Sequence, residues 1–175
     1  MRKPTAAVGS SIFFAVAPGV VAGLIPWMLT GWKVSTVWTS TPWLPTRVVG
    51  WGVLIVSAVL LIRAFARFVT EGLGTPAPIA PPQHLVIGGQ YRYVRNPMYL
   101  AVLGAVLGQA LVLGRPVLLG YAAVVALAVT AFVHWYEEPA LGRQFGDEYQ
   151  EYRANVPGWR PRRRPWSPSP PGRGA

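Results

Sequence analysis

Residues 97–136, PMYLAVLGAVLGQALVLGRPVLLGYAAVVALAVTAFVHWY, decide the fold, because Arg115 is their only charged position: 19 uncharged residues lie between Arg95 and Arg115, and 21 between Arg115 and Glu137. A helix needs about 20 apolar residues to cross roughly 30 Å of hydrocarbon. Gly114-Arg115-Pro116 separates the two halves, and glycine suits a helix end as proline suits a helix start. The stretch therefore predicts two membrane-spanning helices, over about 97–113 and 116–136, joined as a tight hairpin.

The first half of this hairpin carries Gly104 and Gly108 at a spacing of four residues. This spacing places both glycines on one helix face, where it allows two helix backbones to approach closely. We expect it to serve close packing within the hairpin.

A longer uncharged interval lies near the start of the chain, between Lys3 and Lys33. It predicts a first span over about residues 10–30. Pro18 and Pro26 lie inside it. Because proline removes a helical hydrogen bond, we expect this helix to be kinked.

The remaining interval, between Arg47 and Arg63, holds only 15 uncharged residues. At 1.5 Å per residue this is about 22 Å of helix, too short to cross a bilayer. The second span is therefore expected to continue past Arg63 towards Arg67, over about 47–68. Together these intervals predict an all-α membrane protein with four transmembrane helices.

The composition agrees with a membrane protein. Hydrophobic residues make up 52% of the 175 residues, charged residues only 13%, and the mean hydropathy is +0.35. The net charge of +10 is scattered between apolar blocks, which argues against a nucleic-acid partner. The absence of cysteine excludes disulfides, thiolate metal sites and a cysteine nucleophile. Two histidines 50 residues apart and six acids offer no metal-ligand spacing, so no metal is expected.

The basic residues predict the orientation of the four spans. Three of them would lie on one side of the membrane: Lys33, Arg47 and Arg115. The other thirteen would lie on the opposite side: Arg2, Lys3, Arg63, Arg67, Arg92, Arg95, Arg143, Arg153, Arg160, Arg162, Arg163, Arg164 and Arg173. By the positive-inside rule, both termini are cytoplasmic. Five tryptophans around the first outer loop suit the membrane interface: Trp27, Trp32, Trp38, Trp43 and Trp51.

The chain after the fourth span falls into two parts. Apolar and aromatic residues recur at helical spacing and predict a cytoplasmic amphipathic helix that packs on the bundle: Leu141, Phe145, Tyr149 and Tyr152. Residues 161–175 are rich in arginine, proline and serine and are expected to form a disordered tail near anionic headgroups. Residues 1–160 are then a single domain.

Residues 71–100, EGLGTPAPIAPPQHLVIGGQYRYVRNPMYL, are unusually dense in glycine, proline and tyrosine. One interpretation is a backbone cradle in which four glycines let the main chain approach a ligand and three tyrosines offer ring faces: Gly72, Gly74, Gly88, Gly89, Tyr91, Tyr93 and Tyr99. The alternative is an interfacial loop whose tyrosines lie at headgroup level.

Glu137 and Glu138 stand side by side where the fourth span ends. Adjacent carboxylates near lipid repel each other and lose hydration, so a cation or hydrogen bonds must compensate their charge. The alternative is a solvated helix end, although a helix C-terminus disfavours negative charge. The doublet is therefore a candidate for binding a cation.

Two motifs resemble those of a known family. Residues 89–99, GQYRYVRNPMY, resemble the G-x-Y-x-x-x-R-[HN]-P-x-Y signature of the isoprenylcysteine carboxyl methyltransferase and phospholipid methyltransferase group. Downstream, Glu137-Glu138 with Leu141 and residues 145–152, FGDEYQEY, resemble its E-E…L…F-G-x-x-Y-x-x-Y block. The resemblance covers roughly residues 70–161, and the first two helices carry no such signature.

This resemblance implies an integral membrane methyltransferase that uses S-adenosylmethionine. The cofactor-binding residues it implies are Leu85, Val86, Gly89, Tyr91, Arg95, Asn96, Pro97, Tyr99, Glu137 and Glu138. In this arrangement the glutamates and tyrosine faces suit the cationic end of the cofactor, Arg95 its carboxylate, and Leu85 and Val86 its adenine. Many relatives carry histidine where this chain has Asn96, which does not titrate.

The acceptor implied by the resemblance is a lipophilic molecule entering from the bilayer, an isoprenylcysteine-like carboxylate or another small hydrophobic acid or thiol. Arg95 would orient a carboxylate, and His134 is the candidate base for a thiol or amine. The alternatives are N-methylation of a phospholipid amine and a non-catalytic membrane protein. Arg63 either snorkels to headgroups or, with Arg67 one turn later, holds an anionic part of the substrate.

Overall fold

The computed structural model describes residues 16–72 and 84–168. Several predictions therefore lie outside the described residues: the start of the first span at 10–15, Gly74 of the cradle, and residues 169–175 of the tail. Within the described ranges the chain forms helices, turns and loops, and no strand.

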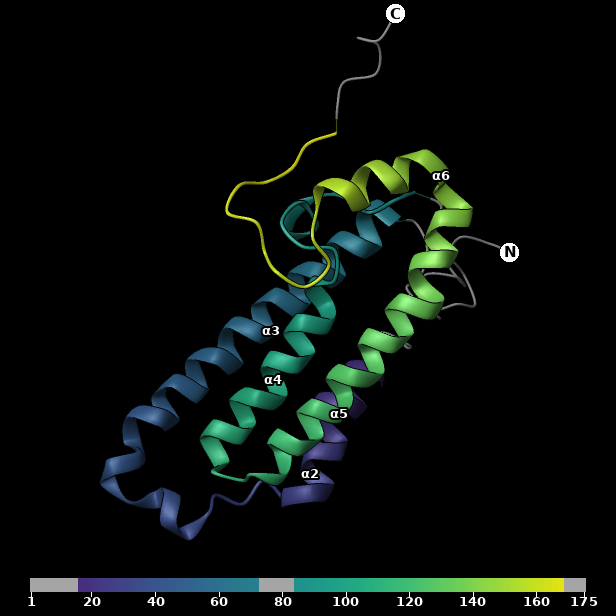
Figure 1. The fold of residues 1–175 in the computed structure, drawn as a ribbon. Helices are drawn as coiled ribbons and strands as arrows, with labels where there is room; N and C mark the ends of the chain where they lie inside the picture. Colours follow the sequence, from purple (N-terminus) through teal and green to yellow (C-terminus); the bar gives the residue numbers. More distant parts are fainter. Residues whose placement is uncertain (1–15, 73–83, 169–175) are drawn as a thin grey trace, which may run out of the picture.

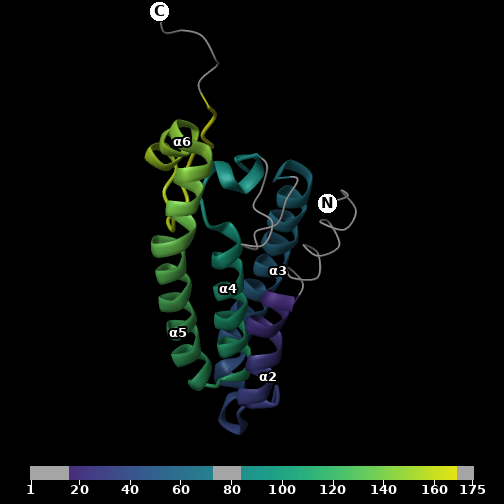
Figure 2. The same cartoon turned by 90° about the vertical axis from the view of Figure 1, so that its right-hand side faces the viewer.

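Long helices lie side by side along one axis, and a further helix crosses their end (Figures 1 and 2). The elements of this bundle are α2 (Ile25–Thr30), α3 (Leu44–Gly72), α4 (Pro97–Leu113), α5 (Val117–Phe132) and α6 (Glu138–Asn155). A π turn, Val133–Glu137, joins α5 to α6 without a break. The all-α prediction is confirmed, and α4 lies between α3 and α5.

The hairpin of α4 and α5 ends where the sequence predicts. Pro97 starts α4, and Gly114 ends it in the left-handed conformation with φ of 62°. An added Cβ at Gly114 would overlap the Trp38 ring, whose Nε1 donates to the Leu111 carbonyl at 2.7 Å. Glycine is therefore required here both for its conformation and for its lack of a side chain.

Helix α3 is longer than its predicted span of 47–68, and it runs past Arg63 and Arg67 as expected. By length and apolar composition, Thr41–Arg67 and Val117–Asn155 can each cross a membrane, whereas Val16–Thr30 and Pro97–Leu113 are shorter apolar helices. The described residues thus support a membrane protein with two candidate spans. Four crossings and the orientation of the termini stay predictions.

The first helix is irregular at the place where prolines predict a kink. A π turn, Val20–Leu24, precedes α2, and the buried Pro26 lies in the first turn of α2. Proline lacks the N–H that would continue regular bonding, and a π turn is a common way to absorb such a defect.

Helices α3 and α4 pack closely through small residues. Gly50, Ser57 and Ala64 recur every seventh position of α3 and are buried. Gly104 and Gly108 of α4 face them, since a Cβ added at Gly108 would lie 3.0 Å from the Gly50 carbonyl oxygen and one at Gly104 would overlap the Ser57 hydroxyl. The glycine pair thus serves packing on α3 and not within the hairpin, because α3 presents the complementary row of small residues.

Residues 156–168, which we call the C-terminal strap, differ from the predicted disordered tail over 161–168. The Arg162 and Trp166 amides donate to the carbonyls of Tyr93 and Arg92 at 2.9 and 3.0 Å. The Trp166 ring lies 5.6 Å from that of Tyr152, measured between centroids. These contacts hold the segment on the bundle, so the proline and arginine content did not predict its structure.

Candidate functional site

The turn Arg92–Asn96, which precedes α4, is held by the strap. It leaves the short 3₁₀ helix Gly89–Arg92 and reaches α4 at Pro97. The Arg95 amide donates to the Pro157 carbonyl at 3.0 Å, and the Asn96 amide to the Gly158 carbonyl at 3.3 Å. Backbone bonds on both sides of the turn therefore set the directions of the Arg95 and Asn96 side chains.

Arg95 connects this turn to the acidic doublet. Its Nη1 donates to Glu138 Oε1 at 2.6 Å and to the Tyr149 hydroxyl at 3.1 Å, while its Nε donates to the Val156 carbonyl at 2.9 Å. Arg153 Nη2 lies 3.1 Å from the second oxygen of Glu138. The negative charge of Glu138 is therefore compensated by two arginines of the protein itself.

Glu137 is the other half of the doublet and has a different environment. Its Oε2 accepts a hydrogen bond from the Tyr99 hydroxyl at 3.0 Å. In the part of the chain that the structure describes, no lysine or arginine forms an ion pair with Glu137. The expectation that the doublet and the tyrosine-flanked turn meet is confirmed. Of the two carboxylates, Glu138 forms ion pairs with described residues and Glu137 does not.

Asn96 carries an unsatisfied donor into the same region. The residue is only 7% exposed, and its buried side-chain Nδ2 has no hydrogen-bond partner. Gly158 lies over it: a Cβ added there would be 3.5 Å from Asn96 Nδ2 and 3.3 Å from Arg95 Nη2. A buried amide without a partner costs about 1–3 kcal/mol, so this position favours a ligand that accepts its hydrogen bond.

Tyr91 and Tyr152 stabilise the turn through hydrogen bonds and burial. The Tyr152 hydroxyl donates to the Tyr91 carbonyl at 2.7 Å, and the Tyr91 hydroxyl contacts Met98 Sδ at 2.9 Å. Burial raises the pKa of the Tyr152 phenol above its usual range, so the phenol stays protonated and remains a donor. Tyr91 is buried and thus supports the turn instead of offering a ring face.

Two other predicted residues pack against the tyrosines of this cluster, and a third is exposed. Leu85 packs on the buried cluster of Tyr149 and Tyr152, and Val86 is buried against Ala64. His134 is exposed and makes an edge contact with the Trp135 ring. The π turn inserts an extra residue here, so the helical spacing that placed His134 on the side of the glutamates does not apply. Its role as a base stays a prediction.

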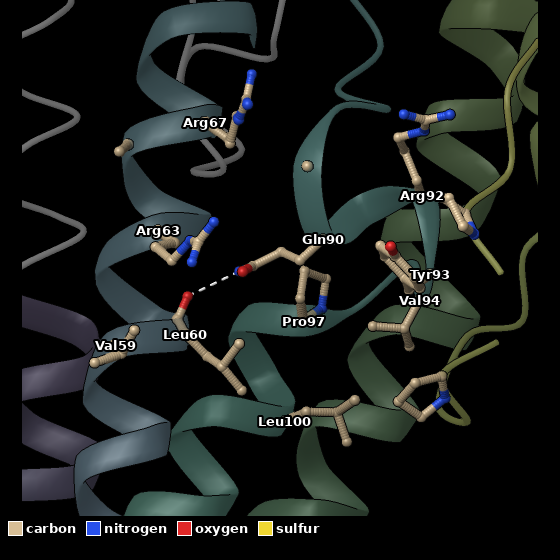
Figure 3. A pocket seen from close by; sticks show the side chains of 14 residues that line it. Val59, Leu60, Arg63, Arg67, Gln90, Arg92, Tyr93, Val94, Pro97 and Leu100 are labelled. Carbon is tan, nitrogen blue, oxygen red and sulfur yellow. Dashed lines mark hydrogen bonds between the residues drawn. The ribbon is translucent and has the colours of Figure 1, made fainter. Parts of the chain in front are cut away.

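A cavity of about 860 Å³ opens on the other side of the turn, between α3 and the 3₁₀ helix (Figure 3). Gly89 and Pro97, both predicted cofactor residues, line it, whereas Arg95, Tyr99 and the glutamates do not. Gly89 has φ of +56°, and an added Cβ would lie 3.0 Å from Arg67 Nε. The predicted site is thus divided by the turn into an acidic side and a cavity side.

Sequence reasoning missed Trp159 and Gly158 of the strap and Arg153 of α6. The Trp159 ring centroid lies 6.4 Å from that of Tyr99. The sequence Pro157-Gly158-Trp159 was the available signal, because a tryptophan after a proline and glycine pair is unusual in a disordered tail. Among the described residues no group of three metal-ligating side chains occurs.

Comparison with known proteins agrees with the two motifs. No curated protein and no solved structure matches the chain. A family model described as phospholipid methyltransferase matches residues 45–148, more than half of the chain. The match begins in α3, so it extends further towards the N-terminus than the motifs alone, and it includes both the turn and the acidic doublet. The chain belongs to the phospholipid methyltransferase family of membrane methyltransferases.

Proposed function

We propose that the protein transfers a methyl group from S-adenosylmethionine to a lipophilic acceptor at the cytoplasmic face of a membrane. The proposal includes four membrane crossings with both termini in the cytoplasm. Two observations on the described residues carry it: the buried Asn96 amide has no hydrogen-bond partner, and Glu137, which accepts a hydrogen bond from Tyr99, forms no ion pair. Both groups lie where the two family motifs meet.

The residues present fit this cofactor. Glu137 and the ring faces of Tyr99 and Trp159 suit its ammonium and sulfonium charges. The Asn96 Nδ2 donor suits its carboxylate or a ribose hydroxyl. Arg95, which the sequence assigns to the carboxylate, already donates to Glu138, so we assign it first to holding the doublet and the strap in place.

The cofactor supplies a methyl group that is open to in-line displacement from its sulfur. The protein's part is to align the acceptor, exclude water and keep the nucleophile in its reactive form. The Tyr99 and Trp159 rings, 6.4 Å apart between centroids, are the aromatic groups that we assign to excluding water beside Glu137. No covalent intermediate with the enzyme is needed, which suits a chain without cysteine.

The proposed acceptor is an isoprenylcysteine-like carboxylate or another small hydrophobic acid or thiol. A carboxylate needs no base, in keeping with the exposed position of His134. The second candidate is a phospholipid amine, which the description of the matching family favours. Transfer of labelled methyl groups into a farnesylcysteine analogue, and not into phosphatidylethanolamine, would support the first acceptor; the reverse result would support the second.

Binding of S-adenosylhomocysteine tests the site itself. The product should raise the Tm of the full-length protein in detergent, and Glu137→Gln with Glu138→Gln should abolish that rise. Asp147 and Glu148 form a second adjacent acidic pair that is exposed, so Asp147→Asn with Glu148→Gln is the matched control and should keep the rise. A non-catalytic membrane protein would show no rise in any variant. An unchanged rise in the Glu137 and Glu138 variant would place the site elsewhere.

A further inference from the structure

The cavity between α3 and the 3₁₀ helix is cationic at one end. Arg63, Arg67 and Arg92 line it, and no aspartate or glutamate is among its lining residues. In Figure 3, Arg63 points from α3 towards Gln90, with Arg67 above it and Arg92 on the far side. Guanidinium groups that share a cavity repel one another, and solvent or a bound anion lowers this repulsion.

The opposite end of the cavity is apolar. Val59 and Leu60 of α3 and Leu100 of α4 line it, one to two turns further into the bundle than the arginines (Figure 3). Val94 and Pro97 add apolar surface between the two ends. The cavity therefore changes from apolar to cationic along the helix axis, which is the polarity of a lipid that has an anionic headgroup.

The walls of this cavity are held at a fixed separation. Gln90 Nε2 donates to the Leu60 carbonyl at 2.8 Å and ties the 3₁₀ helix to α3. Arg92 donates from Nε to the Trp166 carbonyl at 2.5 Å and also bonds the Ser167 hydroxyl, which brings the strap's Pro161 and Pro165 into the lining. The cavity is thus built by three separate parts of the chain.

Arg63 is the arginine available to a ligand. The residue is exposed and lines the cavity, and within residues 16–72 and 84–168 its guanidinium forms no hydrogen bond or ion pair. Arg92, in contrast, is engaged with the strap. We infer that the cavity binds an anionic amphiphile, with its phosphate or carboxylate oxygens on Arg63 and its chain against Val59 and Leu100. This site lies apart from Glu137 and Asn96 and does not depend on the methyl donor.

Binding of short-chain phosphatidic acid to the full-length protein in nonionic detergent tests this inference. We expect it to raise the Tm, with an apparent affinity that Arg63→Gln weakens by about threefold to tenfold and Arg63→Lys weakens less. Arg143 on α6 is exposed, lies outside the cavity and is the matched control, so Arg143→Gln should leave the affinity unchanged.

Two results would overturn the inference. Equal affinities for Arg63→Gln and Arg143→Gln would mean that Arg63 only snorkels to the headgroups. Equal effects of inorganic phosphate and phosphatidic acid at the same concentration would mean a site for free anions and no lipid chain. Short-chain phosphatidylcholine controls for binding of the chain alone. Stabilisation by S-adenosylhomocysteine, measured on the same samples, separates failure of this inference from failure of the proposed function.

Discussion

The Tyr99 hydroxyl donates to Glu137 Oε2 at 3.0 Å, across 38 residues of sequence. This bond joins the first turn of α4 to the end of the helix that began as α5. It therefore links the two ends of the hairpin on the side where both family motifs lie. Its loss should affect ligand binding more than the fold, because the hairpin is also held by packing along its length.

Tyr99→Phe removes this donor while it keeps the ring. A hydrogen bond to a charged group contributes about 1.5–3 kcal/mol, so we expect the Kd for S-adenosylhomocysteine to rise by about tenfold or more. Isothermal titration of the detergent-solubilised protein measures it. Tyr136→Phe is the control, since Tyr136 is exposed and stacks on Phe132. Equal Kd values for the two variants would remove Tyr99 from the site.

The two glutamates should respond differently to single substitutions. Glu138→Gln removes the ion pairs with Arg95 and Arg153. Because the partly buried Arg95 then lacks a compensating charge, the protein should be destabilised by about 2–3 kcal/mol. Glu137→Gln should change stability less and lower the affinity for S-adenosylhomocysteine more. Tm values with and without the ligand distinguish the two effects. A larger loss of affinity in Glu138→Gln would reverse our assignment of roles.

Gly146 allows α6 to bend back on itself. Glu138 and Arg153 are 15 residues apart, about 22 Å along a straight helix, yet their side chains lie 3.1 Å apart. Gly146, with φ of 52° and ψ of −125°, supplies the break. Residues other than glycine rarely adopt these backbone angles. Gly146→Ala should therefore lower the free energy of unfolding by about 1–3 kcal/mol and weaken ligand binding.

Gly142 provides the control for that substitution. It lies in the same helix with ordinary helical geometry, and a Cβ there would be 3.6 Å from the Gln150 amide nitrogen, an ordinary contact. Gly142→Ala should therefore be neutral or stabilising, because alanine favours helix. A Gly146→Ala protein as stable as Gly142→Ala would contradict the role of the bend. Thermal or denaturant unfolding of both variants decides this.

Sequence patterns correctly predicted the features that depend on neighbouring residues, such as the ends of the hairpin helices. Pro97, Gly114 and Pro116 bound the hairpin as expected, because caps depend on residues next to each other. The meeting of the turn and the doublet was also predictable, since an antiparallel hairpin brings the two ends of its sequence to the same side. Helix length beyond Arg63 followed from the bilayer thickness.

The rest depended on contacts between distant segments. The strap looks disordered by composition, and only its backbone bonds to Tyr93 and Arg92 order it. Arg153 reaches Glu138 only because Gly146 bends α6, so the compensation of one glutamate could not be seen from spacing. The unsatisfied Asn96 amide is likewise a property of the folded surroundings, which motif patterns do not contain.

The contact between α3 and α4 offers a test that needs no ligand. A Cβ added at Gly104 would overlap the Ser57 hydroxyl but would lie 3.5 Å from Ser57 Cβ. Gly104→Ala should therefore destabilise the protein by about 1–3 kcal/mol, and Ser57→Ala in the same chain should restore most of the loss. Gly120→Ala is the control, because nothing lies within 4 Å of its added Cβ. Additive losses in the double variant would show that the two helices do not meet at this pair.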